Sequence, residues 1–221
     1  MNKKLIEQLK LIAQEKQTKD DPCHDFNHIL RVLNLGIKIG KKEKADLDVV
    51  IPAILFHDTV VYRKDLPESH NETNESAEVA GTILQSIKKF PQEKIGHIQT
   101  CIRECSFSKG IVASTIEGKV VQDADRLEST GAISIMRTFT SGAQMNRMLY
   151  FPEDPLRENS KPPPYPQPLP SSLDLFFTRL LLVGGTMRTE TGKKMALRRA
   201  KFLDTFLKEL RRELKESGIV K

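Results

Sequence analysis

Two histidines and two aspartates stand where buried ionisable side chains would need a partner. His57 and Asp58 close the apolar run IPAILFHDTVV, His28 lies in HDFNHILRV, and Asp125 lies in QDADRLE. Burying such groups is costly unless they are paired or bind a metal. Two imidazoles and two carboxylates could share one cation that keeps positions open for water and substrate oxygens, as phosphoester hydrolysis requires. Separate structural roles remain open on spacing alone.

The elements that must position these residues are helical, because apolar residues recur with a helical period almost throughout. We expect an all-α, single-domain helical bundle spanning 1–221, with its metal-site core at about 20–140 and C-terminal helices at about 173–216. Asp21 is the expected N-cap of the helix that carries His28, with Pro22 in its first turn. The expected helices are 3–16, 22–41, 47–57, 75–89, one within 91–105, and one from about 119 to 140.

Residues 150–172 interrupt this pattern with eight prolines and cannot be helical throughout. A linker between domains and a site for a proline-binding partner are alternatives. We favour a surface loop, and we expect deletion of part of 158–170 to leave folding intact.

Composition narrows the class of protein. Of the 221 residues, 38% are hydrophobic and 29% charged, which is typical of a globular chain. No apolar run approaches the roughly 20 residues needed to cross a membrane, and the N-terminal segment does not resemble a signal peptide. Three cysteines form no disulfide framework. We therefore expect a cytoplasmic protein with no membrane partner.

The formal charge of +6 is concentrated near the C-terminus. Residues 188–215 hold ten basic and four acidic side chains, so nucleic-acid binding has to be considered. We favour a solvated helix face instead, because no aromatic residues interleave with the basic ones. The apolar residues expected on the opposite, buried face are Leu197, Phe202, Phe206, Leu207, Leu210 and Leu214.

The motifs HDFNHILRV, LFHDT and QDADRLE together resemble the HD-domain superfamily of metal-dependent phosphohydrolases. The segments EGKVVQDADRLESTGAISIMRTF and TETGKKMALRRAKFLDTFLKEL are similar to small stand-alone bacterial members, and the likeness spans most of residues 20–215. The resemblance implies that His28, His57, Asp58 and Asp125 bind one divalent metal ion. It also implies that Asp58 is catalytic through the attacking water. Manganese, magnesium, iron or another first-row metal fits a mixed nitrogen and oxygen ligand set.

Basic side chains near these motifs are candidates for binding substrate phosphates. Arg31, Lys64 and Arg126 are the three that we single out, with Lys64 favoured for its place after the His-Asp pair. Buried ion pairs are the alternative for Arg31 and Arg126. His24 lies one helical turn before His28 and is expected beside the metal ligands or at the surface, not as a fifth ligand. One of Glu72, Glu75 and Glu78 could orient the water, although solvated carboxylates at a helix start are the more ordinary reading.

The sequence differs from the family that it resembles at CSFS, where relatives commonly carry HSFS. Cys105 replaces that histidine, which argues against a second metal ion, and a thiol there is a poor acid for a leaving group. Glu128 stands where Asp is frequent and keeps the charge.

The resemblance implies hydrolysis of a nucleotide or a related small-molecule phosphate ester. Release of pyrophosphate from a nucleoside triphosphate, or of phosphate from a nucleotide, is the favoured reaction. A phosphodiesterase is the alternative within the same superfamily. A metal-dependent nucleotide sensor with low turnover, or a protein associated with nucleic acid, is the alternative outside enzymes. A homodimer is the base-rate expectation for the assembly.

Overall fold

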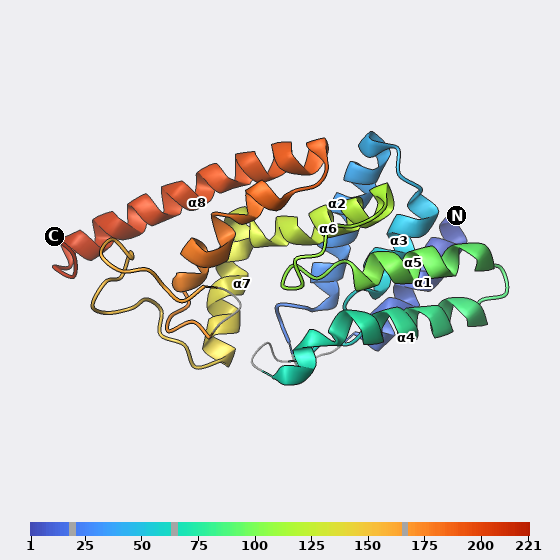
Figure 1. Cartoon of the computed structure of the whole chain (residues 1–221), viewed down its shortest axis with the longest axis horizontal. Helices are drawn as coiled ribbons and strands as arrows, with labels where there is room; N and C mark the ends of the chain where they lie inside the picture. Colours follow the sequence, from blue (N-terminus) through green and yellow to red (C-terminus); the bar gives the residue numbers. More distant parts are fainter. Residues whose placement is uncertain (18–20, 63–65, 165–167) are drawn as a thin grey trace. The chain divides into compact units, whose positions relative to one another are not determined.

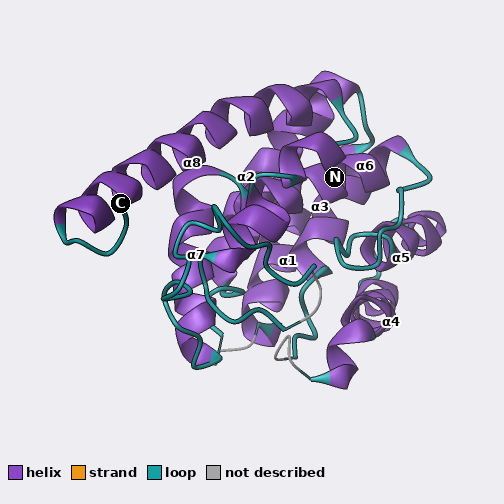
Figure 2. Cartoon of the chain, turned by 60° about the vertical axis from the view of Figure 1, so that its left-hand side comes forward, coloured by secondary structure: helices purple, strands orange, loops and turns teal. Residues whose placement is uncertain are grey.

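The computed structural model describes residues 1–17, 21–62, 66–164 and 168–221. Their regular structure is helical with no β-strand, apart from an isolated bridge between Met148 and Ser171 (Figures 1 and 2). The all-α prediction is thus confirmed. Backbone contacts divide the chain into two compact units. One comprises Met1–Arg126 with Arg188–Gly192, and the other comprises Leu127–Met187 with Lys193–Lys221. A single domain stays a prediction. No helix in the described ranges is long and apolar enough to cross a membrane.

The first unit is built around α3 (Leu47–Phe56), a helix that is apolar on every side. Its residues from Val49 to Phe56 are all buried, as expected for a helix without a polar face. It contacts α1 (Lys3–Lys16), α2 (Phe26–Glu43), α4 (Glu72–Ser86), α5 (Ile95–Arg103) and α6 (Ile116–Arg126). Because His57 and Asp58 directly follow α3, the centre of the core positions the pair.

The start of α2 differs from the prediction. Its N-cap is Asp25 and not Asp21, and the helix begins at Phe26. The Asp25 carboxylate accepts a hydrogen bond from the backbone N–H of His28 at 2.8 Å. Asp21 instead accepts hydrogen bonds from the Cys23 backbone and the His24 ring. Both aspartates suit an N-cap by type, and only the local turn decides between them.

The helix expected from 119 to 140 is also interrupted. After α6 the chain makes a 3₁₀ turn at Leu127–Ser129, and α7 (Gly131–Gln144) begins with Gly131 at a φ of +70°. A left-handed φ is strained for residues other than glycine, so Gly131 permits this change of direction. Asp125 consequently lies in the last turn of α6, next to the break.

The second unit contains α7, the segment 145–187 and most of α8 (Glu190–Glu216). Its buried apolar cluster is Leu173, Phe176, Leu180 and Leu203, with Phe206, Leu207 and Leu210 packed against it. The prediction that α8 buries Leu197 and Phe202 is wrong, because they are 65% and 49% exposed. The buried stripe runs instead through Ala196, Leu203 and Leu214, which leaves those two residues beside it.

The exposed face of α8 carries its basic residues next to acidic ones. Arg212 forms ion pairs with Glu209 and Glu216, and Lys208 pairs with Asp204. These pairs span one helical turn, the spacing at which opposite charges on a helix attract. This arrangement favours the solvated-face interpretation of the basic C-terminus.

The described parts of the proline-rich segment, 150–164 and 168–172, are non-helical, as predicted, but buried polar contacts hold its first half. The Asp154 carboxylate accepts hydrogen bonds from the backbone N–H groups of Glu158, Asn159 and Ser160. Arg157 forms a two-point ion pair with Asp174, at 2.6 and 3.0 Å. The described part of the segment is a surface loop whose base is held by these contacts.

Candidate metal centre

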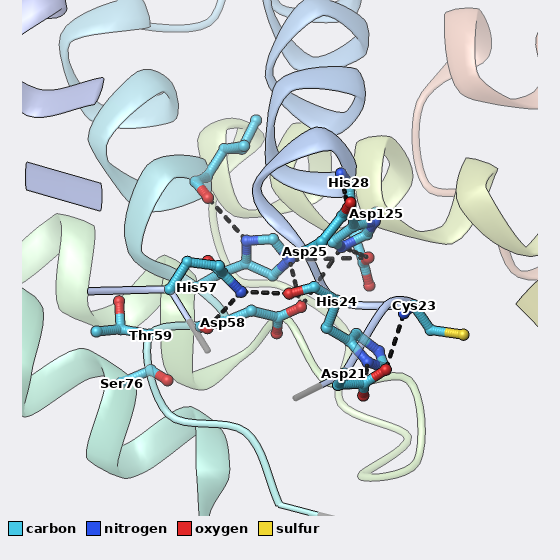
Figure 3. Close-up of polar contacts among 12 residues, drawn as sticks. Asp21, Cys23, His24, Asp25, His28, His57, Asp58, Thr59, Ser76 and Asp125 are labelled. Atoms are coloured by element: carbon cyan, nitrogen blue, oxygen red, sulfur yellow. Dashed lines mark hydrogen bonds and ion pairs between the residues drawn. The ribbon is translucent and has the colours of Figure 1, made fainter. Parts of the chain in front are cut away.

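The structure brings together the four side chains singled out as metal ligands, from three places in the first unit (Figure 3). Asp58 Oδ2 lies 3.4 Å from Nε2 of both His28 and His57. Asp125 Oδ1 lies 3.6 Å from the first of these nitrogens and 3.8 Å from the second. These separations are longer than ordinary hydrogen bonds, whose N···O distances are about 2.7–3.2 Å.

The spacing fits an ion between the donors. Two atoms bound to one cation by bonds of about 2.1 Å can lie no more than about 4.2 Å apart. All four imidazole-to-carboxylate distances are within that limit. One donor atom each from His28, His57 and Asp125 lie mutually within 4.8 Å, while Asp58 joins through its contacts with the two imidazoles.

The ring of His57 is oriented by the turn that ends α3. Its Nδ1 lies 2.7 Å from the carbonyl oxygen of Ile54, which can only accept a hydrogen bond, so Nδ1 carries the proton. In the neutral ring Nε2 then offers its lone pair. That buried atom has no hydrogen-bond partner in the parts of the chain that the structure describes. This is the arrangement of a metal-binding histidine, whose second nitrogen is held by a carbonyl or carboxylate.

The charges of the site are strongly coupled. Burial alone would raise the pKa of Asp58, yet the positive charge on His57 holds it well below the usual range. The pKa of Asp125 is likewise lowered against the effect of burial, chiefly by His57. Burial alone would lower the pKa of His57, but Asp58 and Asp125 raise it to about 9. Two ionised carboxylates therefore concentrate negative charge that a proton on His57 or a cation would neutralise.

His24 is placed beside the centre and outside the cluster of donor atoms. Its ring meets the His28 ring edge-on, with centroids 5.7 Å apart, and its Nδ1 lies 2.6 Å from Asp21 Oδ2. Gln17 donates a hydrogen bond to the His24 carbonyl oxygen and contacts the Asp58 carbonyl oxygen at 3.5 Å. Sequence reasoning missed the roles of Asp21 and Gln17, because neither belongs to a helix period or a motif.

The predicted phosphate contacts have different surroundings. Arg31 is half-buried on α2. Arg126 is only 2% exposed, with its guanidinium 5.5 Å from the centroid of the Phe107 ring. Lys64 lies outside the described residues. Substrate contact by any of the three stays a prediction.

The acidic candidates mainly hold local structure. Glu72 accepts a hydrogen bond from the Tyr62 backbone N–H, and Glu75 accepts one from the Tyr62 hydroxyl. Glu78 pairs with Arg103 on α5. The first two fix the chain that leaves Asp58, which favours the structural reading.

Cys105 is buried at 2% exposure. Burial raises the pKa of its thiol well above the ordinary value, and the carboxylates of Asp125 and Asp58 raise it further. The thiol is neutral at physiological pH and too weak an acid to protonate a leaving group. The surroundings of Cys105 therefore agree with the expectation that a thiol at this position is a poor acid for a leaving group.

The HD domain family matches residues 25–130, which contain all four clustered side chains. Protein YpgQ of Bacillus subtilis is 31% identical over 215 residues, which cover 96% of this chain and 94% of YpgQ. The chain belongs to the HD-domain superfamily. Members of this superfamily are metal-dependent hydrolases in general, as the resemblance in the motifs implied.

Solved structures extend the likeness to nearly the whole fold. An HD-superfamily hydrolase from Bacillus thuringiensis has a TM-score of 0.71 and 28% identity, covering 96% of this chain and 97% of its own. YpgQ in complex with ADP has a TM-score of 0.70 and 29% identity, covering 97% of this chain and 100% of its own. The likeness to these structures thus extends to the helices beyond residues 25–130.

Proposed function

We propose that this HD-domain protein is a phosphohydrolase that uses one divalent metal ion and acts on a nucleotide or a related phosphate ester. The observation that carries the proposal is the convergence of two imidazoles and two carboxylates at distances suited to one cation. The complex of YpgQ with ADP supports a nucleotide as the ligand class. Cleavage of a nucleoside triphosphate to pyrophosphate, or release of phosphate from a nucleotide, is the favoured reaction.

In this mechanism His28, His57, Asp58 and Asp125 would hold the ion. When bound, the ion lowers the pKa of water and offsets the negative charge of the phosphate. His57 is held in the metal-binding tautomer by the Ile54 carbonyl oxygen. Asp58 would stay ionised beside the bound cation, so its carboxylate could accept a hydrogen bond from the attacking water and orient it. Manganese and magnesium are the first ions to test because carboxylate and water oxygens suit them, and nickel follows because imidazole nitrogens suit it.

The test is a panel of reactions with the purified protein. Manganese, magnesium, cobalt and nickel would each be combined with nucleoside tri-, di- and monophosphates and a generic phosphodiester. Phosphate and pyrophosphate would be measured separately. We expect turnover to fall to background in Asp58→Ala, together with the bound metal. The matched control is Asp204→Ala, which removes an exposed carboxylate on α8 and should change neither.

The outcomes separate the alternatives. Hydrolysis of the phosphodiester alone would identify a phosphodiesterase of the same superfamily. Metal-dependent nucleotide binding without product would identify a low-turnover sensor, a reading that the neutral, buried thiol of Cys105 favours. Steeply salt-dependent nucleic-acid binding that survives Asp58→Ala would point to the basic helix instead.

A further inference from the structure

Lys109 is a half-buried cation whose described contact is an uncharged group. Its Nζ donates a hydrogen bond of 2.6 Å to the hydroxyl of Thr73, in the first turn of α4. Among the described residues it forms no ion pair with a carboxylate. Burial lowers the pKa of Lys109, while the nearby Glu72 raises it. Loss of hydration without a paired anion is unfavourable for an ammonium group, unless a ligand supplies the anion.

Contacts along α4 connect Lys109 to the chain that follows Asp58. Ser76, one helical turn after Thr73, exchanges hydrogen bonds with the backbone N–H and carbonyl of Val60, at 3.0 and 3.4 Å. Val60 follows Asp58 by two residues, and Figure 3 shows Ser76 near Thr59, on the chain that leaves Asp58. One turn of helix rises about 5 Å, so the Lys109 ammonium at Thr73 is about one turn of α4 from the contact with Val60.

Residues that precede Lys109 in its loop lie close to the metal centre. Cys105 is buried and close enough for the charges of Asp125 and Asp58 to act on it. Phe107 lies under the guanidinium of Arg126, which follows Asp125 in the chain. The loop therefore runs from the metal ligands to the first turn of α4, and Lys109 is its last side chain before Gly110.

We propose that Lys109 binds a phosphate group of the substrate that lies next to the one attacked at the metal, so that the site favours di- and triphosphates over monophosphates. This inference rests on the proposed function. In the ligand complex the ammonium would leave or share Thr73 and form charge-assisted hydrogen bonds to phosphate oxygens. Its flexible stem permits that short movement. A polyphosphate would then span the cation in the metal centre and the cation on the loop.

Calorimetric binding of inorganic pyrophosphate and inorganic phosphate to the magnesium-loaded protein tests this inference without turnover. Lys109→Met keeps the length of the side chain and removes its charge. We expect pyrophosphate to bind about tenfold to a hundredfold more weakly, the range for loss of one hydrogen bond to a charged group. Phosphate, which occupies the metal position alone, should change by less than about threefold on the same reasoning.

Three further measurements exclude a structural cause. Lys109→Arg should keep most of the pyrophosphate affinity, and Lys89→Met, which removes an exposed lysine after α4, should bind like the wild type. Metal content should be unchanged in all variants. For any triphosphate that is hydrolysed, Lys109→Met should raise KM far more than it lowers kcat.

Equal losses for phosphate and pyrophosphate, or unchanged pyrophosphate affinity, would overturn the inference. Failure of the proposed function looks different. In that case the wild-type protein would hydrolyse no substrate in the panel, while pyrophosphate binding would still depend on Lys109.

Discussion

The orientation of single side chains decides the chemistry that this centre can support. His57 could present either ring nitrogen, and the carbonyl oxygen of Ile54 determines that Nε2 faces Asp58 and Asp125. The backbone of His28 is held in turn by the carboxylate of Asp25. The His57 imidazole and the backbone of His28 are therefore positioned before a ligand arrives, which reduces the entropy lost on binding a metal.

The pKa of His57 leads to a prediction for the metal-free protein. Its value of about 9, against 6.5 as the ordinary value, means that protonation stabilises the folded state. This contribution is complete below pH 6.5 and is lost as pH rises through about 9. The difference corresponds to a free energy of unfolding that falls by about 3 kcal/mol across this range. Urea unfolding in the presence of a chelator measures it.

His57→Gln is the control for this prediction, because glutamine does not titrate. It should remove most of the dependence between pH 6.5 and 9. Low pKa values keep Asp58 and Asp125 ionised throughout this window, so they do not add to the slope. A metal-free wild type whose stability is constant over the window would contradict the assignment of the proton to His57.

Among the elements, α3 and α6 contribute most to the site because each ends where a ligand begins. His57 caps the buried α3, and Asp125 lies in the last turn of α6. Two positions further back, Asp123 accepts hydrogen bonds from the backbone of Arg188 and Thr189. A carboxylate on α6 thus holds the start of the C-terminal segment within the same unit as the metal centre.

The proline-rich segment supplies a prediction at this scale. Arg157 and Asp174 form a buried ion pair with side-chain exposures of 6% and 1%. Arg157→Ala would leave the Asp174 carboxylate buried without this partner, so we expect the free energy of unfolding to fall by about 3–5 kcal/mol. Chemical denaturation measures the loss.

The matched control is Arg211→Ala, which breaks an ion pair with Glu158 of the same loop. Those side chains are 49% and 44% exposed, so the expected loss is below about 1 kcal/mol. Equal effects of the two substitutions would show that burial of the Arg157–Asp174 ion pair does not increase its contribution to stability. Because Asp154 accepts hydrogen bonds from residues 158–160, we expect deletions that begin at 158 to lower stability more than deletions that begin after 160.

For the whole molecule, the similarity to YpgQ covers nearly the full length of both chains. The helices beyond the matched HD domain are thus part of the shared architecture. The charge of +6 belongs largely to the exposed face of α8, where several charges are paired along the helix. Its contribution to partner choice is expected to be secondary to the metal centre.

Metal binding should be visible in the stability of the whole protein. A ligand at about one hundred times its Kd that binds only the folded state adds about 2.7 kcal/mol. For a chain of this size each kcal/mol corresponds to about 2–4 °C, so manganese should raise Tm by about 5–10 °C. Asp58→Ala should abolish the shift and Asp204→Ala should retain it. A shift of equal size in Asp58→Ala would place the ion elsewhere.

The sequence by itself determined the helical class, the helix Lys3–Lys16, the start of α3 at Leu47 and the four candidate ligands. These depend on local period and on motif residues, which are visible along the chain. The sequence was a weaker guide where two nearby residues could each begin or end a helix. Asp25 caps α2 where Asp21 was expected, and α6 ends at Arg126 where a continuous helix was predicted.

Only the tertiary structure decided which of these residues meet. Sequence separation says nothing about the 3.4 Å between Asp58 and His28, because packing of α2 against α3 creates that distance. The same holds for Lys109 and Thr73, which lie in different elements and share no motif. It also holds for α8, where packing against Leu173, Phe176 and Leu180 buries Leu203 and leaves Phe202 exposed. These distances depend on how the whole chain packs, and the period and spacing of residues along the sequence do not determine them.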